Sequence, residues 1–584
     1  MDYDFTVPVP ELKGKISRQK TKSGTYIHYI LERTYDEKKR HTVPKRVLIG
    51  KLSNEDGRMF PNKSFFTYFP NTPRPESPAS TSRCSVLSMG AYAVISKIVN
   101  EYGLKEMLEK YFGNKAGLAL DLASYMIVEE QNQGQHFPDY AYHHALFSNG
   151  MKIASDSTIS RFLSSITDDQ ITGFLNEWSE RQDHKSKIYI SYDSTNKNSQ
   201  AGDVDFLEFG NAKVDIGAPI FNVALAYDRN NQVPLFYELY PGSINDVSQF
   251  RYFVDKTEAY GFKGVGFIID RGYFSKANID YMDEHKYEFV MMVKGCKSLV
   301  ADLVDATRGK FENSLDHRIA GRRISGITVS RPLYENDQKN RFFHLFFNPF
   351  KMASEQAKFE DQLEEMKSAF DRAVGMKVKF GRPFTDYFVC HYDKAERFLF
   401  AKIKKEVVEK RMSRLGYFCI ITSENMTARD AYLLYTSRDA SEKLFSSDKS
   451  FLGSNSMRVH SAESISAKIF IEFVGLIIRQ RMYVLLKEQM LKLPVRKNYL
   501  TIPAAIRELS KIELIRVNHK KYQLDHAVTK NQEIILRSFG LTKESVAEEA
   551  SNIANIIEAS EQAKGNLEEY GDDNNGEAQD YGVY

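Results

Sequence analysis

Four residues with phosphate- and metal-binding chemistry occur at a fixed spacing near residue 440. Tyr435, Arg438, Glu442 and Lys449 are separated by two, three and six residues. At about 100° per residue they project onto one side of a helix, next to an apolar stripe that would seat the helix on a core. A carboxylate flanked by two cations and a phenol suits metal-assisted phosphodiester chemistry. The structural alternative is an amphipathic helix in which Arg438 and Glu442 form an ordinary i,i+4 ion pair.

Two upstream aspartates favour the chemical interpretation. Each follows a short strand-like run: Asp193 ends KIYISYD before the polar turn-forming residues 194–196, and Asp270 ends VGFIID. In open α/β sheets ligands collect outside the carboxyl ends of strands, so two aspartates placed there can share one cation site. A lone aspartate in this position is more often a helix cap or a turn residue.

The combination of two strand-end aspartates and a helical glutamate resembles the DDE transposases of bacterial insertion sequences. It resembles in particular the group whose glutamate region carries the signature Y-x2-R-x3-E-x6-K, because every signature position is filled here at the correct spacing. Further likeness lies in DRGYFSKANI from Asp270, LFYELYPGSINDVSQF from Leu235, LGYFCIITS from Leu415 and RVHSAESISAKIFIEF from Arg458. The likeness runs from about residue 185 to 490, and more loosely to about 540.

The resemblance implies a DNA transposase with an RNase H-like core. It implies that Asp193, Asp270 and Glu442 are the catalytic metal ligands, and that Tyr435, Arg438 and Lys449 hold DNA phosphates near the transposon end. The implied partners are double-stranded DNA, as terminal inverted repeats and as target, and a second copy of the chain in a synaptic homodimer. The expected location is the cytoplasm, at the nucleoid.

The chemistry of phosphodiester cleavage fits these residue types. Two divalent ions about 3.5 to 4 Å apart can assist an in-line nucleophile and stabilise the leaving oxygen. Hard carboxylate oxygens select Mg²⁺ or Mn²⁺. We expect Asp193 to bridge two ions, with Asp270 and Glu442 each holding one. Water would first expose a 3′-hydroxyl, which would then attack target DNA. Arginine suits bidentate phosphate binding, whereas lysine acts as a point charge.

Composition is consistent with a large intracellular enzyme. The chain has 584 residues, which predicts two to four domains. Four scattered cysteines form no C-x-x-C pair and indicate neither a zinc site nor a disulfide framework. The start of the chain lacks the features of a signal peptide, and the most apolar stretch, 469–478, is interrupted by Glu472 and is too short to span a bilayer.

Charge is distributed unevenly along the chain. Residues 13–51 carry a net charge of +9 and residues 541–584 carry −9, so the first 540 residues carry +12. The basic segment alternates in hydrophobicity around a charged break at 36–40, which predicts a β-hairpin arm over 1–70 suited to polyanions or to a solvated surface. The acidic segment 541–584 is predicted to be disordered over its last twenty or so residues.

The pattern between these ends predicts the remaining domains. A linker at 70–84 precedes a helical DNA-binding or dimerisation module at 85–180, in which the capped segment 155–163 could act as a recognition helix. Trp178, the only tryptophan, is expected to pack. The first part of the catalytic core, 185–295, should contain strands at 187–193, about 204–226 with a turn near 211–215, 233–240, 265–270 and 288–293, with a helix from 245.

Three antiparallel strands, a crossover helix and then parallel strands is the order of an RNase H-like mixed α/β sheet with helices on both faces. A largely β insertion subdomain is expected at 296–425, because 171 residues separate Asp270 from Glu442. The second part of the core, 426–540, holds the signature helix and a long apolar helix at 465–492. A metal-dependent nuclease or resolvase on the same fold and a catalytically silent DNA-binding protein are the competing functions.

Overall fold

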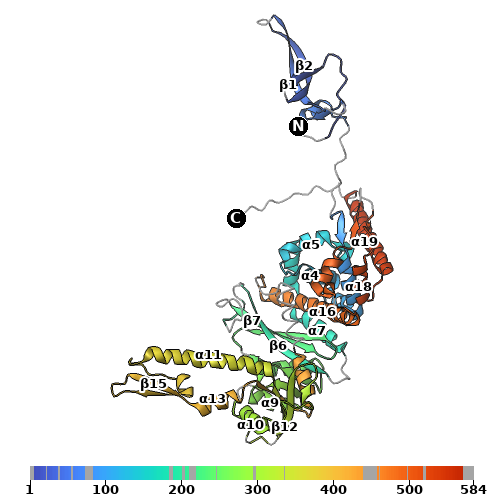
Figure 1. Ribbon diagram of the computed structural model, residues 1–584. Helices are drawn as coiled ribbons and strands as arrows, with labels where there is room; N and C mark the ends of the chain where they lie inside the picture. The colour runs from blue at the N-terminus through green and yellow to red at the C-terminus, as the bar shows by residue number, and fades with distance from the viewer. Residues whose placement is uncertain are drawn as a thin grey trace. The chain divides into compact units, whose positions relative to one another are not determined.

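The computed structural model describes residues 5–21, 23–36, 40–53, 57–72, 83–182, 188–199, 204, 206–209, 219–244, 246–293, 297–334, 336–337, 339–438, 457–459, 461–495, 497–516 and 521–569 (Figure 1). The chain divides into two compact units, Met1–Ser82 and Arg83–Tyr584. Within the described residues, no helix combines the length and the apolar character needed to cross a membrane.

The first unit is a small antiparallel sheet with its own core. Its strands run in the order β1 (Ile16–Thr21), β2 (Gly24–Asp36), β3 (His41–Leu52) and β4 (Met59–Pro61), followed by α1 (Lys63–Tyr68). β2 and β3 pair antiparallel from Tyr26 opposite Lys51 to Asp36 opposite His41, which confirms the predicted hairpin. Ile27, Ile49 and Phe65 are buried between sheet and helix. The basic side chains therefore lie on a folded scaffold.

The helical module begins the second unit. Its elements are β5 (Val86–Ser88), α2 (Gly90–Tyr102), α3 (Leu104–Phe112), η1 (Gly113–Lys115), α4 (Ala116–Glu129), η2 (Gly134–His136), α5 (Phe137–His143), η3 (Asn149–Met151), α6 (Asp156–Ser165) and α7 (Asp168–Glu180). α6 begins as its sequence predicts, because the Ser155 hydroxyl accepts a hydrogen bond from the Thr158 amide at 3.2 Å.

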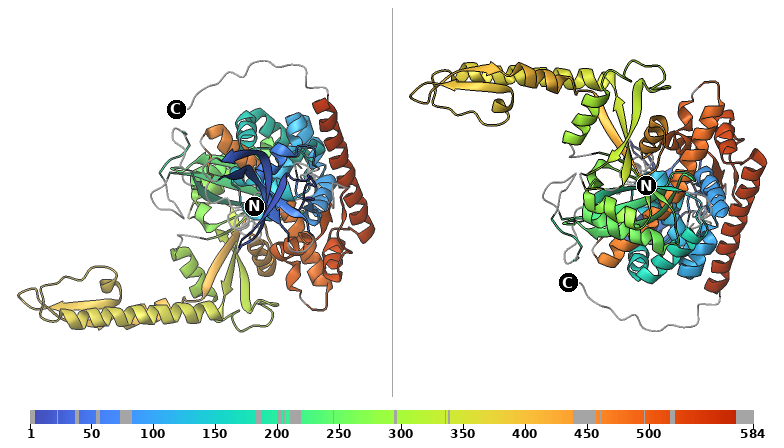
Figure 2. Two further views of the ribbon diagram at one scale, coloured as in Figure 1. Left: turned by 90° about the horizontal axis from the view of Figure 1, so that it is seen from above. Right: turned by 90° about the horizontal axis from the view of Figure 1, so that it is seen from below.

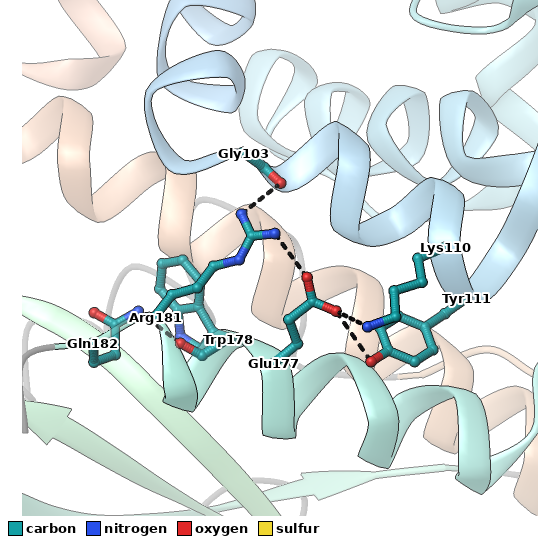
Figure 3. A network of polar contacts seen from close by, with 7 residues as sticks. All are labelled: Gly103, Lys110, Tyr111, Glu177, Trp178, Arg181 and Gln182. Carbon is teal, nitrogen blue, oxygen red and sulfur yellow. Dashed lines mark hydrogen bonds and ion pairs between the residues drawn. The ribbon is translucent and has the colours of Figure 1, made fainter.

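A polar network on α7 joins the module's helices to one another and to the central sheet (Figure 3). Glu177 accepts from Lys110 at 2.7 Å and from Arg181 at 2.7 Å, and Lys110 holds the pKa of Glu177 below its usual value. The Trp178 indole donates to the Pro234 carbonyl at 3.0 Å, and its side chain is buried. Trp178 is therefore a packing residue, as expected.

The core of the second unit is a mixed sheet of nine strands in the described part of the chain. Their order is β11-β12-β13-β16-β10-β9-β6-β7-β8. The strands are β6 (Tyr189–Asn198), β7 (Ile220–Asp228), β8 (Val233–Pro241), β9 (Gly266–Ile269), β10 (Glu288–Met292), β11 (Arg318–Ile319), β12 (Ile324–Pro332), β13 (Asn340–Phe347) and β16 (Tyr417–Thr422). β6, β7 and β8 are antiparallel, whereas β6, β9 and β10 are parallel. This order of antiparallel and then parallel strands is the predicted one.

Helices cover both faces of this sheet, and the alternation of side chains decides which residues face which helix. On one face Phe250 and Phe253 of α8 (Asp246–Ala259) pack against Tyr192. α9 (Lys276–Glu284), after η4 (Arg271–Tyr273), and α10 (Lys297–Thr307) follow α8 along the chain. On the other face Phe473 of α16 (Ala462–Lys492) packs against Tyr237 of β8.

The second face is shared between two helices. α14 (Ala428–Thr436) buries Leu434 against β9, β10 and β16, while α16 covers β6, β7 and β8. Figure 1 shows α16 lying between the sheet and α4 of the helical module. α16 is therefore apolar nearly all round, which explains why its sequence shows no single apolar stripe.

Two predicted boundaries differ from the structure. The segment expected as a strand at 204–226 forms β7 only from Ile220, with an isolated bridge from Ile220 back to Glu208; the turn predicted near 211–215 lies outside the described residues. β12, β13 and β16 join the central sheet, so the region expected as an insertion subdomain is in part a continuation of the core. The first part of the acidic segment folds as α19 (Lys543–Glu569), because Val546, Ile553 and Ile557 recur at helical spacing and are buried, whereas the residues after 569 lie outside the described part of the chain.

A separate arm carries the rest of the insertion. It consists of α11 (Pro349–Ala373), α12 (Phe384–Tyr387), β14 (Phe388–Tyr392), β15 (Phe398–Ile403) and α13 (Lys405–Met412), with Phe370 at the centre of its own apolar core. α11 lies alongside β15 in both views of Figure 2. The described part of the chain then continues with η5 (Asn498–Leu500), α17 (Ile502–Leu509), β17 (Glu513–Ile515), β18 (Gln523–Leu524), α18 (Lys530–Ser538) and α19. β17 pairs with β5, which joins the C-terminal helices to the helical module.

Candidate active site

Asp193 and Asp270 lie on neighbouring parallel strands at the same level. β6 and β9 pair from Tyr189 opposite Gly266 to Tyr192 opposite Ile269. Asp193 directly follows Tyr192, and Asp270 directly follows Ile269. The backbone of Asp270 is still extended, with φ −68° and ψ 156°. Adjacent strands lie about 4.8 Å apart, and paired residues point to the same face. The register therefore places both carboxylates on the face of the sheet that α14 and α16 cover. They lie at the boundary between the strands covered by α14 and the strands covered by α16.

Asp193 does not end its strand, which corrects the sequence prediction. The polar residues 194–196, predicted as a turn, instead continue β6, which pairs with β7 as far as Asn198, and Asp193 itself lies opposite Leu225. Pairing with an apolar neighbour strand holds this polar sequence in extended form in spite of its turn propensity. Asp193 does mark the place where the parallel pairing with β9 stops, so it still lies at the carboxyl edge of the parallel strands.

A hydrogen-bonded link joins the two aspartate segments from the opposite face. The Ser194 amide donates to Asp193 Oδ1 at 2.9 Å, and the Tyr273 hydroxyl donates to the Ser194 hydroxyl at 2.8 Å. Tyr273 closes the short helix η4 that follows Asp270, and its ring packs on Tyr192. The turn after β9 is thereby tied to β6 next to Asp193. Sequence reasoning missed this link, because nothing in the local pattern connects residues 79 positions apart.

Tyr435 and Arg438 contact Asp270. The Tyr435 hydroxyl lies 3.4 Å from Asp270 Oδ1, and an Arg438 guanidinium nitrogen lies 3.7 Å from the same oxygen. The Arg438 guanidinium also lies over the Tyr435 ring at 5.6 Å. The Arg438 side chain is 13% exposed, and the Asp270 side chain is 35% exposed. Two of the predicted phosphate-binding residues thus meet one predicted metal ligand.

The helix that carries Tyr435 ends earlier than its sequence suggests. α14 ends at Thr436, and Arg438 follows in a turn closed by its amide to the Tyr435 carbonyl at 3.1 Å. The Thr436 and Ser437 hydroxyls donate to the Tyr432 and Leu434 carbonyls, a local competition with the backbone that favours a helix end. The prediction that Tyr435 and Arg438 share one continuous helix is therefore wrong.

Glu442 and Lys449 lie outside the described residues. Among the residues that are described, no three histidine, cysteine or acidic side chains group closely enough to hold a metal ion. Asp193 and Asp270 supply two adjacent carboxylates, and carboxylate oxygens are the ligands that Mg²⁺ and Mn²⁺ prefer. Their chemistry fits a divalent cation that receives a further ligand from elsewhere in the chain.

A buried charge cluster lies further along β6 on the same face. The Lys197 ammonium contacts Glu472 Oε2 of α16 at 2.8 Å, and both side chains are 2% exposed. The Asn132 side chain, from the loop after α4, donates to the other Glu472 oxygen at 3.4 Å. Sequence reasoning noted Glu472 only as an interruption in an apolar run. A lone acid in such a run was the available signal that a buried partner exists.

Solved structures with weak likeness to this chain include two transposases. One is the cryo-EM structure of the piggyBac transposase synaptic complex with hairpin DNA, with 8% identity, a TM-score of 0.30 and 69% of this chain covered. This chain spans 65% of that one's length. The other is the Mos1 transposase paired-end complex with the left transposon end, with 10% identity, a TM-score of 0.13, and coverage of 40% of this chain and 69% of that one. At these TM-scores neither likeness bears on the fold or the function.

Sequence comparison is more informative about the domain. No curated protein matches the chain. The family model described as "Transposase DDE domain" matches residues 211–478, which run from the segment before β7 into α16 and include Asp270, Tyr435 and Arg438, whereas Asp193 lies 18 residues before the match. The similarity to the transposase DDE domain therefore covers residues 211–478, which is less than half of the chain.

Proposed function

We propose that this protein is a DNA transposase of the Y-x2-R-x3-E-x6-K group of bacterial insertion sequences. It would cut DNA at transposon ends and join the exposed 3′-hydroxyl to target DNA, acting as a synaptic homodimer at the nucleoid. The observation that carries the proposal is the register of β6 and β9, which sets Asp193 beside Asp270 next to a matched transposase domain. The strand order β8-β7-β6-β9-β10 supports an RNase H-like core.

Asp193, Asp270 and Glu442 would hold two Mg²⁺ or Mn²⁺ ions in this proposal. When bound, such ions lower the barrier for phosphodiester cleavage by stabilising the attacking and leaving oxygens. The protein's own part is positioning. The link from Ser194 to Tyr273 fixes the two aspartate segments relative to each other. The contact with Asp270 holds the Arg438 guanidinium next to the proposed site. There the guanidinium could bind a DNA phosphate next to the scissile bond in place of the Asp270 carboxylate.

The test uses a supercoiled plasmid that carries the candidate terminal inverted repeats, incubated with the full chain and Mg²⁺. We expect end cleavage and strand transfer. Asp193→Asn, Asp270→Asn and Glu442→Gln should each lower the cleavage rate by about 10³-fold or more, equal to about 4 kcal/mol of barrier, while end binding persists. Asp280→Asn, an exposed position on α9, is the matched control.

Two results would contradict the proposal. Cutting that is indifferent to the repeats, without strand transfer, would favour a metal-dependent nuclease or resolvase. Full activity of Asp193→Asn would remove that residue from the set of metal ligands.

A further inference from the structure

A cavity lies where the helical module meets the start of α16, away from the aspartates. Its volume is about 540 Å³, and its walls come from α4, the η2 segment, α6, residues 458, 459 and 461, and the first turns of α16. The lining includes apolar residues such as Tyr125, Leu163 and Ile471. It also includes the cations Arg458 and Lys468. The cavity therefore combines an apolar surface with two cations.

The charges around this cavity are unbalanced. Lys468 is 3% exposed, and its ammonium donates to the Met457 carbonyl at 2.5 Å. Among the described residues, the buried carboxylate of Glu472 contacts Lys197 and is also close enough to influence Lys468. Two buried ammonium groups are thus near this carboxylate. The cavity lining in the described part of the chain also includes the cation Arg458 and one acid, Asp156, both exposed. An excess of positive charge in a poorly solvated place favours the binding of an anion.

The same imbalance appears in the ionisation of Lys468. The pKa of Lys468 is lowered to about 8, mainly because the ammonium is buried; Glu472 opposes this shift, and Lys197 and Arg458 contribute to it. An anion in the cavity would stabilise the protonated ammonium and raise this pKa.

The neutral polar groups of the cavity suit phosphate oxygens. Hydroxyls come from both sides: Ser164 of α6 lies 3.3 Å from Ser464 of α16, and Ser461 is 3.1 Å from Ser464. Hydroxyls and cations can together donate to three oxygens, as a phosphate group requires. The volume exceeds what a phosphate alone would fill, and the apolar part of the lining offers a surface for the group that the phosphate is esterified to.

We propose that this cavity binds the phosphate group of a nucleotide unit, with Arg458 and Lys468 as its cationic ligands. The nucleotide could be free or part of a DNA strand, and the DNA case rests on the proposed function. In that case the site would hold DNA between α6 of the helical module and α16 of the catalytic core. It would lie beyond the end of β6, since the Met457 amide donates to the Asn198 carbonyl at 3.2 Å.

The test compares probes and variants of the full chain. The probes are AMP, adenosine, inorganic phosphate and a fluorescein-labelled single-stranded oligonucleotide, with binding followed by thermal shift and by fluorescence anisotropy. The variants are Lys468→Met, which keeps the length of the side chain, and Arg458→Gln, which is exposed and leaves the core unchanged. Lys97→Gln, an exposed cation on α2, removes the same charge elsewhere on the helical module.

We expect Lys468→Met and Arg458→Gln each to weaken binding by about tenfold, and Lys97→Gln to change it by less than about twofold. The slope of log affinity against log salt for the oligonucleotide should fall by about one in each cavity variant. Binding of AMP but not adenosine, lost in both variants, would identify a free nucleotide as the ligand. Binding of the oligonucleotide alone, again lost in both, would identify the DNA strand.

Other outcomes overturn the site. Wild-type affinity for every probe in both variants would do so, as would a wild-type chain that binds none of the probes. Arg458→Gln keeps the test valid if Lys468→Met folds poorly. Asp193→Asn distinguishes the two proposals, because it should lose strand cleavage and keep this binding. If Asp193→Asn loses both strand cleavage and binding at the cavity, the substitution has disrupted the fold.

Discussion

The three buried charges near α16 make a quantitative prediction about stability. Lys197, Lys468 and Glu472 are each no more than 3% exposed, and they hold two positive charges against one negative charge. Glu472→Gln removes the only carboxylate of the three and leaves two cations. Removing one partner from a buried pair costs about 3–5 kcal/mol. Lys197→Met should lower the stability less than Glu472→Gln does. In that variant Glu472 still has two partners: Lys468, one helical turn away, and the Asn132 amide.

Lys468→Met should have the opposite sign. A pKa of about 8 in place of 10.5 means that the protonated Lys468 destabilises the folded chain by about 3 kcal/mol at pH 7. The variant also loses the hydrogen bond from Lys468 to the Met457 carbonyl, which lowers its stability by about 1 kcal/mol. The net expectation is a gain of about 2 kcal/mol. Because the folded pKa is lowered, wild-type stability should rise as pH goes from about 8 to 10.5, and the variant should lack that rise.

Urea unfolding monitored by fluorescence can test this order. Trp178 is the only tryptophan and is buried, and it lies on α7, whose Phe174 packs on Phe470 of α16. Its emission therefore reports the unfolding of this region. At an m-value of about 3 kcal/mol/M, Glu472→Gln should lower the urea midpoint by about 1 M or more. A Lys197→Met variant as unstable as Glu472→Gln, or a Lys468→Met variant clearly less stable than wild type, would refute the argument from two buried cations and one buried carboxylate.

Two further predictions concern other buried positions. Burial lowers the pKa of His344 to about 4. The folded protein should therefore keep its full stability above pH 6.5 and lose stability as the pH falls toward 4, with a loss of about 2 kcal/mol at pH 5. In His344→Gln the urea midpoint should fall less on acidification. Gly117→Ala would place a Cβ 2.6 Å from the Phe147 carbonyl oxygen and should cost about 1–3 kcal/mol in urea unfolding, whereas Gly134→Ala, whose nearest neighbour is a side-chain methyl at 3.4 Å, should be nearly neutral. Equal midpoints for the two alanine variants, or an unchanged acid response in His344→Gln, would contradict these arguments.

Local patterns predicted the elements whose shape depends on nearby residues. The buried runs that form β8, β9 and β10 were found within one or two residues, and the helix after Ser155 begins at its cap. The expectation of a DDE transposase, drawn from the aspartates and the signature, is supported by the family match over residues 211–478. The identity of each metal ligand and phosphate-binding residue stays a prediction.

The predictions failed where a distant partner decides the structure. Residues 194–196 have turn propensity, yet pairing with β7 keeps them in a strand. β12 and β13 lie in the predicted insertion subdomain, but the pairing of β13 with β16 makes them part of the central sheet. α14 ends at Thr436 through hydroxyl-to-carbonyl bonds that helical periodicity does not reveal. In each case the deciding interaction lies outside the pattern that was used.

The helical module and the central sheet are one physical unit, although the sequence divides them. β6 carries Asp193 outside the matched domain, and four residues later it carries Lys197, whose ammonium contacts Glu472 of α16. The same carboxylate is bound by Asn132 of the module, and Trp178 of α7 holds β8. The strand that bears Asp193 is thus held partly by residues of the module at 85–180. A site built on adjacent strands needs its carboxylates fixed within about 0.5 Å, so these contacts serve the proposed chemistry as well as stability.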